Sequence, residues 1–469
     1  MRDRLTDKHA APADGLPPEP PEPLSHSLKQ RHLTMLGLGG VIGAGLFVGS
    51  GAGISIAGPA IICSYLLAGV LAMLVMRMLG EMSAAMPASG SFSVYAEKAL
   101  GRWAGFSAGW LYWFLLVVVL AVEATGAAKI ANGWLPAVDQ WVWVLIFMVV
   151  FTVTNLTAVK NFGEFEFWFA ALKVAAIVLF LILATLAVFG LLPDTHPVGV
   201  GNLTGHGGFF PKGFGGVVAG MLAVVFAFGG LEVVTIAAAE SDDPARSVAR
   251  AVRSAVWRIL FFYVGSMLVI VTLLPWDSLE PGQSPYVAVL DSIGIPSAGQ
   301  IMEIVVFVAL LSALNANLYG SSRMVFSLAE RGEAPKGLLK VSGGGVPRRA
   351  VFASVAFGFV SVVLNLLWPD TVFLYMLNAV GAVLLFVWAL IAVSQLRLRR
   401  RIEREMPERL TLPMWCFPFL TWAALLGMAA VLVLMLFDDA ARPQLLWSSG
   451  AAAVVLAIAG VRELRARRA

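Results

Sequence analysis

Long apolar runs, separated by short polar or charged segments, set the pattern of this chain. The run from Leu33 to Met76 has no charged residue and is long enough for two bilayer-spanning helices, with Pro59 at the start of the second. Ten further apolar runs each have the length that a helix needs to cross a bilayer. They lie at about 103–128, 137–157, 165–192, 213–239, 256–275, 300–323, 350–368, 372–396, 413–437 and 443–461. The pattern predicts an all-α membrane protein with twelve transmembrane helices.

The composition agrees with this pattern, because 59% of the 469 residues are hydrophobic and only 13% are charged. A soluble globular protein carries roughly 25% charged residues. The segments between the predicted spans are too short for a catalytic or sensory domain, which argues against a membrane-anchored enzyme or a receptor. Cys63 and Cys416 lie in or beside apolar spans without the spacing of a disulfide framework or a metal site, so we expect no metal and no cofactor.

Positively charged side chains predict how the chain is oriented. If both termini are cytoplasmic, only Lys129, Lys212 and Arg442 fall in external loops and only Lys173 lies within a span. The other 29 of the 33 Lys and Arg residues are then cytoplasmic, which is the usual bias of membrane proteins. Contact with anionic membrane lipid explains the net charge of +4, and we expect no nucleic-acid partner.

Two of the predicted spans contain a glycine-rich interruption, at 39–47 in the first span and at 226–232 in the sixth. Glycine within an apolar helix weakens the helix and frees backbone groups. The two spans run in opposite directions, so we predict a five-plus-five inverted repeat with broken helices 1 and 6. The expected units are a disordered cytoplasmic tail at 1–28, a first repeat at 29–192, a second repeat at 213–397, helices 11 and 12 at 410–461, and a cytoplasmic tail at 462–469.

The two interruptions together predict a site for a small zwitterion. Unwound backbone at membrane depth must line a cavity or be buried in protein. The stretch Gly43-Ala44-Gly45 lets the backbone leave helical geometry, so the outer half-helix would begin near Leu46 and its free N–H groups would bind a carboxylate. Free carbonyls of the second interruption would accept hydrogen bonds from an ammonium, so the pair fits an α-amino acid. The alternative is close helix packing through small residues.

Three charged residues lie within predicted spans and are candidates for coupling. Glu123 lies in the outer part of span 3, Lys173 in span 5, and Glu232 just after the second interruption. Charges in a membrane are costly and usually face the protein interior, where they serve function. The alternatives are a structural ion pair, for instance between Glu232 and Lys173, and a packing or snorkelling role for Glu123 near the end of its helix.

Motifs spread over roughly residues 29–410 resemble the amino acid–polyamine–organocation superfamily. Within it, the chain is similar to the bacterial amino acid transporter family, and its motifs lean toward the γ-aminobutyrate-type permeases. The matching stretches are Arg31-His32-Leu33-Thr34-Met35, 40–50, Met76-Arg77-Met78-Leu79-Gly80-Glu81-Met82, Gly101-Arg102-Trp103-Ala104-Gly105, 163–169, 235–241 and Ser322-Arg323-Met324.

The resemblance implies proton-driven uptake across the plasma (inner) membrane and a substrate site at the two interruptions. It implies carboxylate contacts from backbone groups of Gly43, Ala44 and Gly45, and amine contacts from carbonyls that fall here on Val41, Phe226 and Gly229. Ile42 completes the implied substrate-binding set. It also implies that Lys173 stands where sodium-coupled relatives hold a sodium ion, and that Glu232 takes part in coupling.

Two departures from the family pattern bear on selectivity. Several relatives have a hydroxyl where this chain has Ala44, and 228–231 departs from the Phe-Ile-Gly-Thr type, which enlarges the space near the substrate side chain.

The leading hypothesis is therefore a secondary active permease that imports γ-aminobutyrate or a neutral or hydrophobic amino acid together with protons. One alternative is an amino acid exchanger. Another is a transporter-like amino acid sensor, although sensors of this kind usually carry a longer cytoplasmic tail. We expect no enzymatic activity, because no nucleophile–base or metal-ligand constellation is evident. The predicted partners are an amino acid substrate, protons and membrane lipid.

Overall fold

The computed structural model of this chain describes residues 42–88, 91–157, 162–193, 195–232, 244–279, 283–342, 346–437 and 442–468. All regular elements in these residues are helices, so the all-α prediction is confirmed for this part of the chain. Nine helical segments in these ranges are long and apolar enough to cross a membrane, and two further apolar helices are shorter. The count of twelve spans and the inverted repeat stay predictions. The predicted tail at 1–28 lies outside the described residues.

The first described segment contains two of the predicted spans. It comprises α2 (Ala44–Phe47), α3 (Gly49–Ala57), a 3₁₀ turn (Gly58–Ala60) and α4 (Ile61–Ala85). The prediction from Pro59 is confirmed, because this proline lies in the turn that precedes α4. Its ring cannot supply an N–H, and at the start of a helix no such donor is needed.

The remaining helices follow the apolar runs closely. They are α5 (Ser91–Leu100), α6 (Arg102–Trp134), α7 (Gln140–Thr157), α8 (Phe162–Val188), α9 (Gly201–Thr204), α10 (Gly213–Ala227), α12 (Pro244–Arg258), a π-helical turn (Ile259–Val264), α13 (Gly265–Leu273), α14 (Pro285–Ser292), α15 (Ala298–Glu330), α16 (Arg348–Leu367), α17 (Val372–Glu405), α18 (Phe419–Met435) and α19 (Arg442–Arg468).

Several helices continue past the ends of the predicted spans, among them α6, α15, α17 and α19. The apolar run predicts that the tenth span ends at 396, but α17 continues to Glu405 through the arginine-rich segment. Arg399 pairs with Glu403, and Arg401 with Glu405, each at an N···O distance of 2.8 Å one turn along the helix. Charge ends the part of a helix that lies in the bilayer, but it does not end helical geometry, and such pairs support it.

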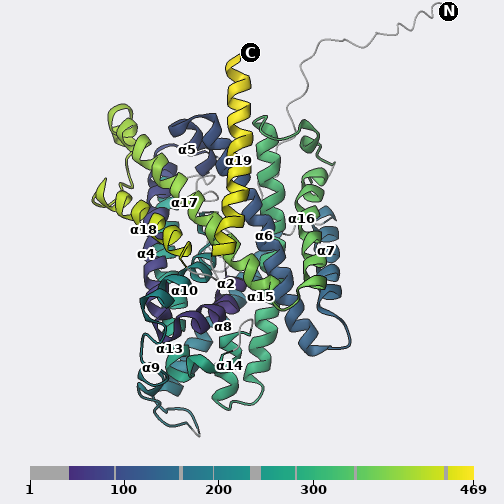
Figure 1. Ribbon diagram of the computed structural model, residues 1–469, viewed down its shortest axis with the longest axis vertical. Coiled ribbons are helices and arrows are strands. Elements are labelled where there is room, and N and C mark those ends of the chain that lie inside the picture. Colours follow the sequence, from purple (N-terminus) through teal and green to yellow (C-terminus); the bar gives the residue numbers. More distant parts are fainter. Residues whose placement is uncertain are drawn as a thin grey trace, which may run out of the picture.

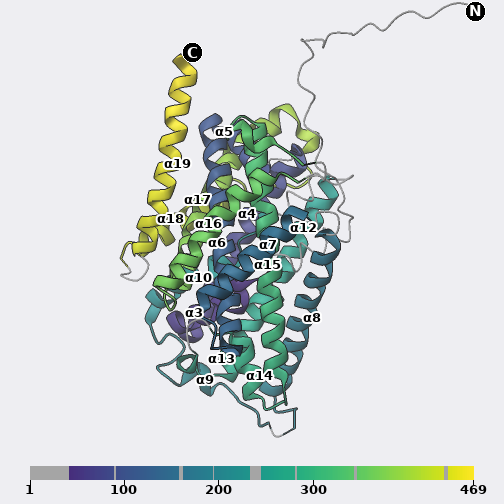
Figure 2. The same ribbon diagram turned by 90° about the vertical axis from the view of Figure 1, so that its right-hand side faces the viewer.

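The helices form one bundle with α2 near its middle (Figure 1). The long helix α6 packs against α15 and α17, and α10 packs against α3, α4 and α17. In both views α5 and the C-terminal end of α19 lie at one end of the molecule, whereas α9 and α14 lie at the other (Figures 1 and 2).

The outermost helices carry the apolar surface that a membrane would cover. Figure 2 shows α8 and α19 on opposite sides of the bundle. Large apolar side chains such as Trp168 on α8 and Val454 on α19 are more than half exposed. In contrast, most of α6 is buried. Apolar helices therefore have two environments here: α6 is surrounded by protein, whereas α8 and α19 turn apolar side chains toward the lipid that a membrane would provide.

Candidate functional site

The first interruption is real, but it differs from the prediction in detail. Gly43 has φ −146° and ψ −145°, and α2 begins at Ala44 rather than near Leu46. The chain leaves helical geometry again at Val48, with φ −121°, before α3 begins. The carbonyl of Gly43 accepts the N–H groups of Leu46 and Phe47 at 3.3 and 3.2 Å, so those two donors are already used. The glycine pattern indicates a break but not the residue at which the helix resumes.

The backbone N–H of Ala44 donates to the carboxylate of Glu123, at 3.1 Å to Oε1 and 3.0 Å to Oε2. Glu123 lies on α6, and only 3% of its surface is exposed. The expectation that Glu123 stands near the end of its helix is wrong, because α6 continues to Trp134, eleven residues beyond Glu123. That distance is about 16 Å along the helix axis. Its buried contact with Ala44 fits a packing role as well as a functional one. A carboxylate is therefore bound at the predicted backbone position, and it belongs to the protein itself.

Gly43, directly before α2, and Gly45 within it are both needed for close approach by other elements. A Cβ atom on Gly43 would lie 2.3 Å from Oε1 of Glu123. A Cβ atom on Gly45 would lie 2.6 Å from Cα of Ala227 and 2.8 Å from the ring of Phe226, both on α10. Close packing through small residues and a functional break thus occur together in this segment. Val41 lies outside the described residues, and Ile42 is buried directly before the break.

The second interruption follows α10. The helix ends at Ala227, and Gly230 has φ +90°, a backbone conformation that glycine adopts without strain. The carbonyl of Phe226 accepts the N–H of Gly229 at 2.9 Å, so this predicted amine contact already serves one backbone donor. A carbonyl oxygen has a second lone pair that an ammonium can use.

Glu232 holds this second interruption in place. Its carboxylate accepts the N–H of Gly230 at 2.9 Å and also accepts the indole N–H of Trp388 on α17. Its residue is fully buried. These contacts give Glu232 a positioning role at the break, whether or not it also carries a proton.

Lys173 on α8 is 1% exposed, and its Nζ has no hydrogen-bond partner among the described residues. The acids that act on it electrostatically are Glu166 and Glu123. Glu232 contacts Gly230, Trp388 and Tyr112, and Arg258 acts on it electrostatically. None of these described contacts supports the alternative of a Glu232–Lys173 ion pair.

Sequence reasoning missed Glu166. It is fully buried on α8, and one of its oxygens accepts the hydroxyl of Ser312 on α15 at 3.1 Å. It precedes Lys173 by seven residues, which is two helical turns, so both side chains share one face of α8. That spacing was the available signal, but Glu166 stands close to the predicted start of its span and therefore resembled an interfacial charge.

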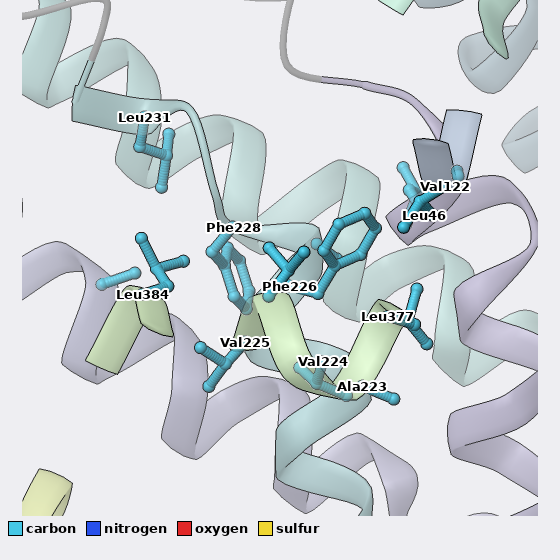
Figure 3. Close-up of a cluster of buried hydrophobic side chains, with 14 of the residues drawn as sticks. Leu46, Val122, Ala223, Val224, Val225, Phe226, Phe228, Leu231, Leu377 and Leu384 are labelled. Atoms are coloured by element: carbon cyan, nitrogen blue, oxygen red, sulfur yellow. The ribbon is translucent and has the colours of Figure 1, made fainter. Parts of the chain in front are cut away.

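The two interruptions meet through apolar contacts. In Figure 3 the ring of Phe226 lies on the side of Leu46 and Leu377, whereas Phe228 lies on the side of Leu384. Phe228 stacks on Tyr263, with ring centroids 4.9 Å apart and an interplanar angle of 19°. Phe228 thus belongs to an aromatic cluster that supports the break.

A small cavity lies close to α2 among the described residues. It has a volume of about 20 Å³ and adjoins Val48, Thr125 and Lys129, which is space for about one water molecule. A larger cavity of about 570 Å³ lies between α8 and the segment that carries Trp257 and Phe261. The cavity close to α2 is too small for an amino acid, so binding there would require its lining residues to move apart.

Comparisons with known proteins give matches along nearly the whole chain. Residues 32–461 match the family described as amino acid permease. The chain is 50% identical to the gamma-aminobutyric acid permease of Bacillus subtilis, over 92% of each chain. It is also 50% identical to the aromatic amino acid transport protein AroP of Corynebacterium glutamicum, over 90% of this chain and 92% of that one. Identity to a probable GABA permease of Pseudomonas aeruginosa is 49%, over 90% of each chain.

Proposed function

The chain belongs to the amino acid permease family, and we propose that it imports γ-aminobutyrate or a neutral or hydrophobic amino acid across the plasma membrane together with protons. One observation carries the coupling part of this proposal. The buried carboxylate of Glu123 on α6 accepts the N–H of Ala44 at the first interruption, and the buried Lys173 on α8 acts electrostatically on that carboxylate.

The substrate site would be formed by the two interruptions. The N–H groups of Gly43, Ala44 and Gly45 would bind the carboxylate, and carbonyls of Val41, Phe226 and Gly229 would bind the ammonium. Such contacts are available once the apolar contact between α2 and α10 opens, because Gly45 now lies against Phe226 and Ala227. Opening and closing of this contact would expose the site to one side of the membrane at a time.

Coupling would rest on Lys173, with Glu123 and Glu232 as the acids of the site. A charged Lys173 is stabilised by Glu166 and Glu123, and loss of its proton removes that attraction between α8 and α6. Glu232 is the rival proton carrier. Its contacts to Gly230 and Trp388 favour a role in shaping the second interruption.

We further propose twelve spans, with repeats at 29–192 and 213–397 and with both termini cytoplasmic. The 42-residue segment Ala44–Ala85 is long enough for two spans, so the nine long apolar segments would provide ten spans. The shorter apolar helices α10 and α18 would provide the remaining two. The predicted cytoplasmic segment α5 and the C-terminal end of α19 lie at the same end of the bundle, which supports this topology (Figures 1 and 2). A reporter fused after Ala469 that is active only outside the cell would overturn it.

Uptake into proteoliposomes tests the function. Uptake of labelled γ-aminobutyrate and phenylalanine is measured while the external pH is varied from about pH 5 to about pH 8. Buried groups with perturbed pKa values titrate in this range. We expect the wild type to accumulate at least one of them in response to a proton gradient. Lys173→Ala should lose this response, and Glu232→Gln should keep it.

The contrary results are equally clear. Full gradient-driven accumulation by Lys173→Ala would make the lysine structural, and loss of the response in Glu232→Gln alone would assign the proton to the glutamate. Uptake that requires an amino acid inside the vesicles, with no response to the gradient, would identify an exchanger. Binding without any uptake would identify a sensor.

A further inference from the structure

A carboxylate of the protein occupies the backbone position that the substrate carboxylate would use. The N–H of Ala44 donates to both oxygens of Glu123, at 3.1 and 3.0 Å. Gly43 leaves just enough room for this contact, since a Cβ atom there would lie 2.3 Å from Oε1. A single N–H cannot serve two carboxylates at full strength, so a substrate carboxylate must compete with Glu123 for Ala44.

A second and independent observation shows where Glu123 can go. The Nζ of Lys173 is buried and has no hydrogen-bond partner among the described residues. A buried ammonium without a partner is costly, and it gains from any carboxylate that reaches it. Glu123 and Lys173 already act on each other electrostatically. Among the residues described, Glu166 is the other acid near Lys173; its Oε2 accepts a hydrogen bond from Ser312, whereas its buried Oε1 has no hydrogen-bond partner there.

We infer that Glu123 is a built-in substitute for the substrate carboxylate, which substrate must displace from the Ala44 N–H toward Lys173. This inference rests on the proposed function and adds to it a specificity-determining residue. Without substrate, the contact satisfies a freed backbone donor and holds α6 against α2 in the closed arrangement. With substrate, only a ligand that brings its own carboxylate can replace Glu123 without leaving that donor unpaired, so amines that lack a carboxylate are rejected.

The opposite role for the same residue is that Glu123 binds the substrate ammonium directly. The two roles predict changes of opposite sign. If Glu123 competes with the substrate, its removal tightens substrate binding. If Glu123 binds the ammonium, its removal weakens binding.

Titration calorimetry on the purified protein in detergent distinguishes these roles. The probes are γ-aminobutyrate with its decarboxylated analogue propylamine, and phenylalanine with phenethylamine. For Glu123→Ala we expect the amino acid that the wild type transports to bind about tenfold more tightly or better, because a charge-assisted hydrogen bond no longer competes. Its maximal uptake rate should fall, because the closed arrangement without substrate loses its contact. The matching amine should show no gain in affinity.

Two further variants protect the test against misfolding and against a general charge effect. Glu123→Gln keeps the shape of the side chain and an oxygen that can accept a hydrogen bond from the N–H of Ala44. The affinity of this variant for the amino acid should therefore lie between those of the wild type and Glu123→Ala. Glu166→Ala removes a buried acid near Lys173 that does not contact Ala44, so it should tighten binding less than Glu123→Ala does.

The inference is overturned if Glu123→Ala and Glu123→Gln bind the amino acid as weakly as the wild type or more weakly. It is also overturned if Glu166→Ala tightens binding equally, or if the amine gains as much as the amino acid. These failures differ from failure of the proposed function, which would appear as absence of amino acid uptake by the wild type itself.

Discussion

The contact between the two interrupted segments can be tested by adding one methyl group at Gly45. In Gly45→Ala the new Cβ would lie 2.6 Å from Cα of Ala227 and 2.8 Å from Cδ1 of Phe226. Ordinary contact between carbon atoms requires about 3.5–4.0 Å, so α2 and α10 must separate by roughly 1 Å. The nearest atom is backbone and cannot rotate away, unlike the end of a flexible side chain.

The expected cost follows from overpacking of a close-packed interior. Inserting a methyl group where neighbours cannot yield typically costs about 1–3 kcal/mol. If the closed arrangement alone carries this cost, its population falls by about fivefold to 150-fold relative to an open arrangement. Uptake should fall, because transport requires both arrangements in turn, and the melting temperature in detergent should fall with it.

The assay is gradient-driven uptake in proteoliposomes together with thermal melting of the same preparation. Gly427→Ala on α18 is the matched control, because a Cβ atom there meets nothing within 4 Å. Alanine is also the better helix former, so this control should melt at the same temperature or slightly higher. If Gly45→Ala transports and melts like Gly427→Ala, then α2 and α10 are not in close contact in the membrane, and the site built on their contact is wrong.

Three further substitutions test other buried polar contacts. Glu81→Gln removes the charge that pairs with Arg399 in the buried contact between α4 and α17, and should lower the free energy of unfolding by about 3–5 kcal/mol, measured by thermal melting. Trp388→Phe removes the indole donor to Glu232 and should cost about 1.5–3 kcal/mol with a loss of uptake. Burial raises the pKa of Glu333 in the folded protein. The contribution of Glu333 to stability should therefore decline as the pH rises from the ordinary pKa of a glutamate through the raised pKa. Glu333→Gln should flatten the resulting decline in melting temperature.

Each of these substitutions has an exposed counterpart. Glu405→Gln breaks only an exposed pair with Arg401 and should cost no more than about 1 kcal/mol. Trp422→Phe changes an exposed indole on α18 and should leave melting and uptake unchanged. Glu408→Gln changes an exposed side chain and should leave the melting temperature unchanged. An equal effect in any counterpart would show that the buried contact is not the cause.

The helices and most of their bounds could be predicted because a bilayer acts on each segment separately. A span must be apolar and about 20 residues long, and both properties can be counted along the chain. The same is true of the interruptions, since glycine weakens a helix wherever it stands. Local rules failed at the end of α17, where charge was mistaken for the end of a helix, and at Leu46, because the residue that resumes the helix depends on its neighbours.

The partners of the charged residues were decided by tertiary packing alone. Glu123 meets Ala44 across 79 residues of sequence, and Gly45 meets Ala227 across more than twice that separation. In spans that are apolar on every side, hydrophobic periodicity does not specify how a helix is rotated about its axis. Composition and position along the chain therefore determined that Glu123 and Lys173 lie in helices long and apolar enough to cross a membrane. The rotation and contact of α2, α6 and α8, set by close packing of whole surfaces, decided which groups these two charges face.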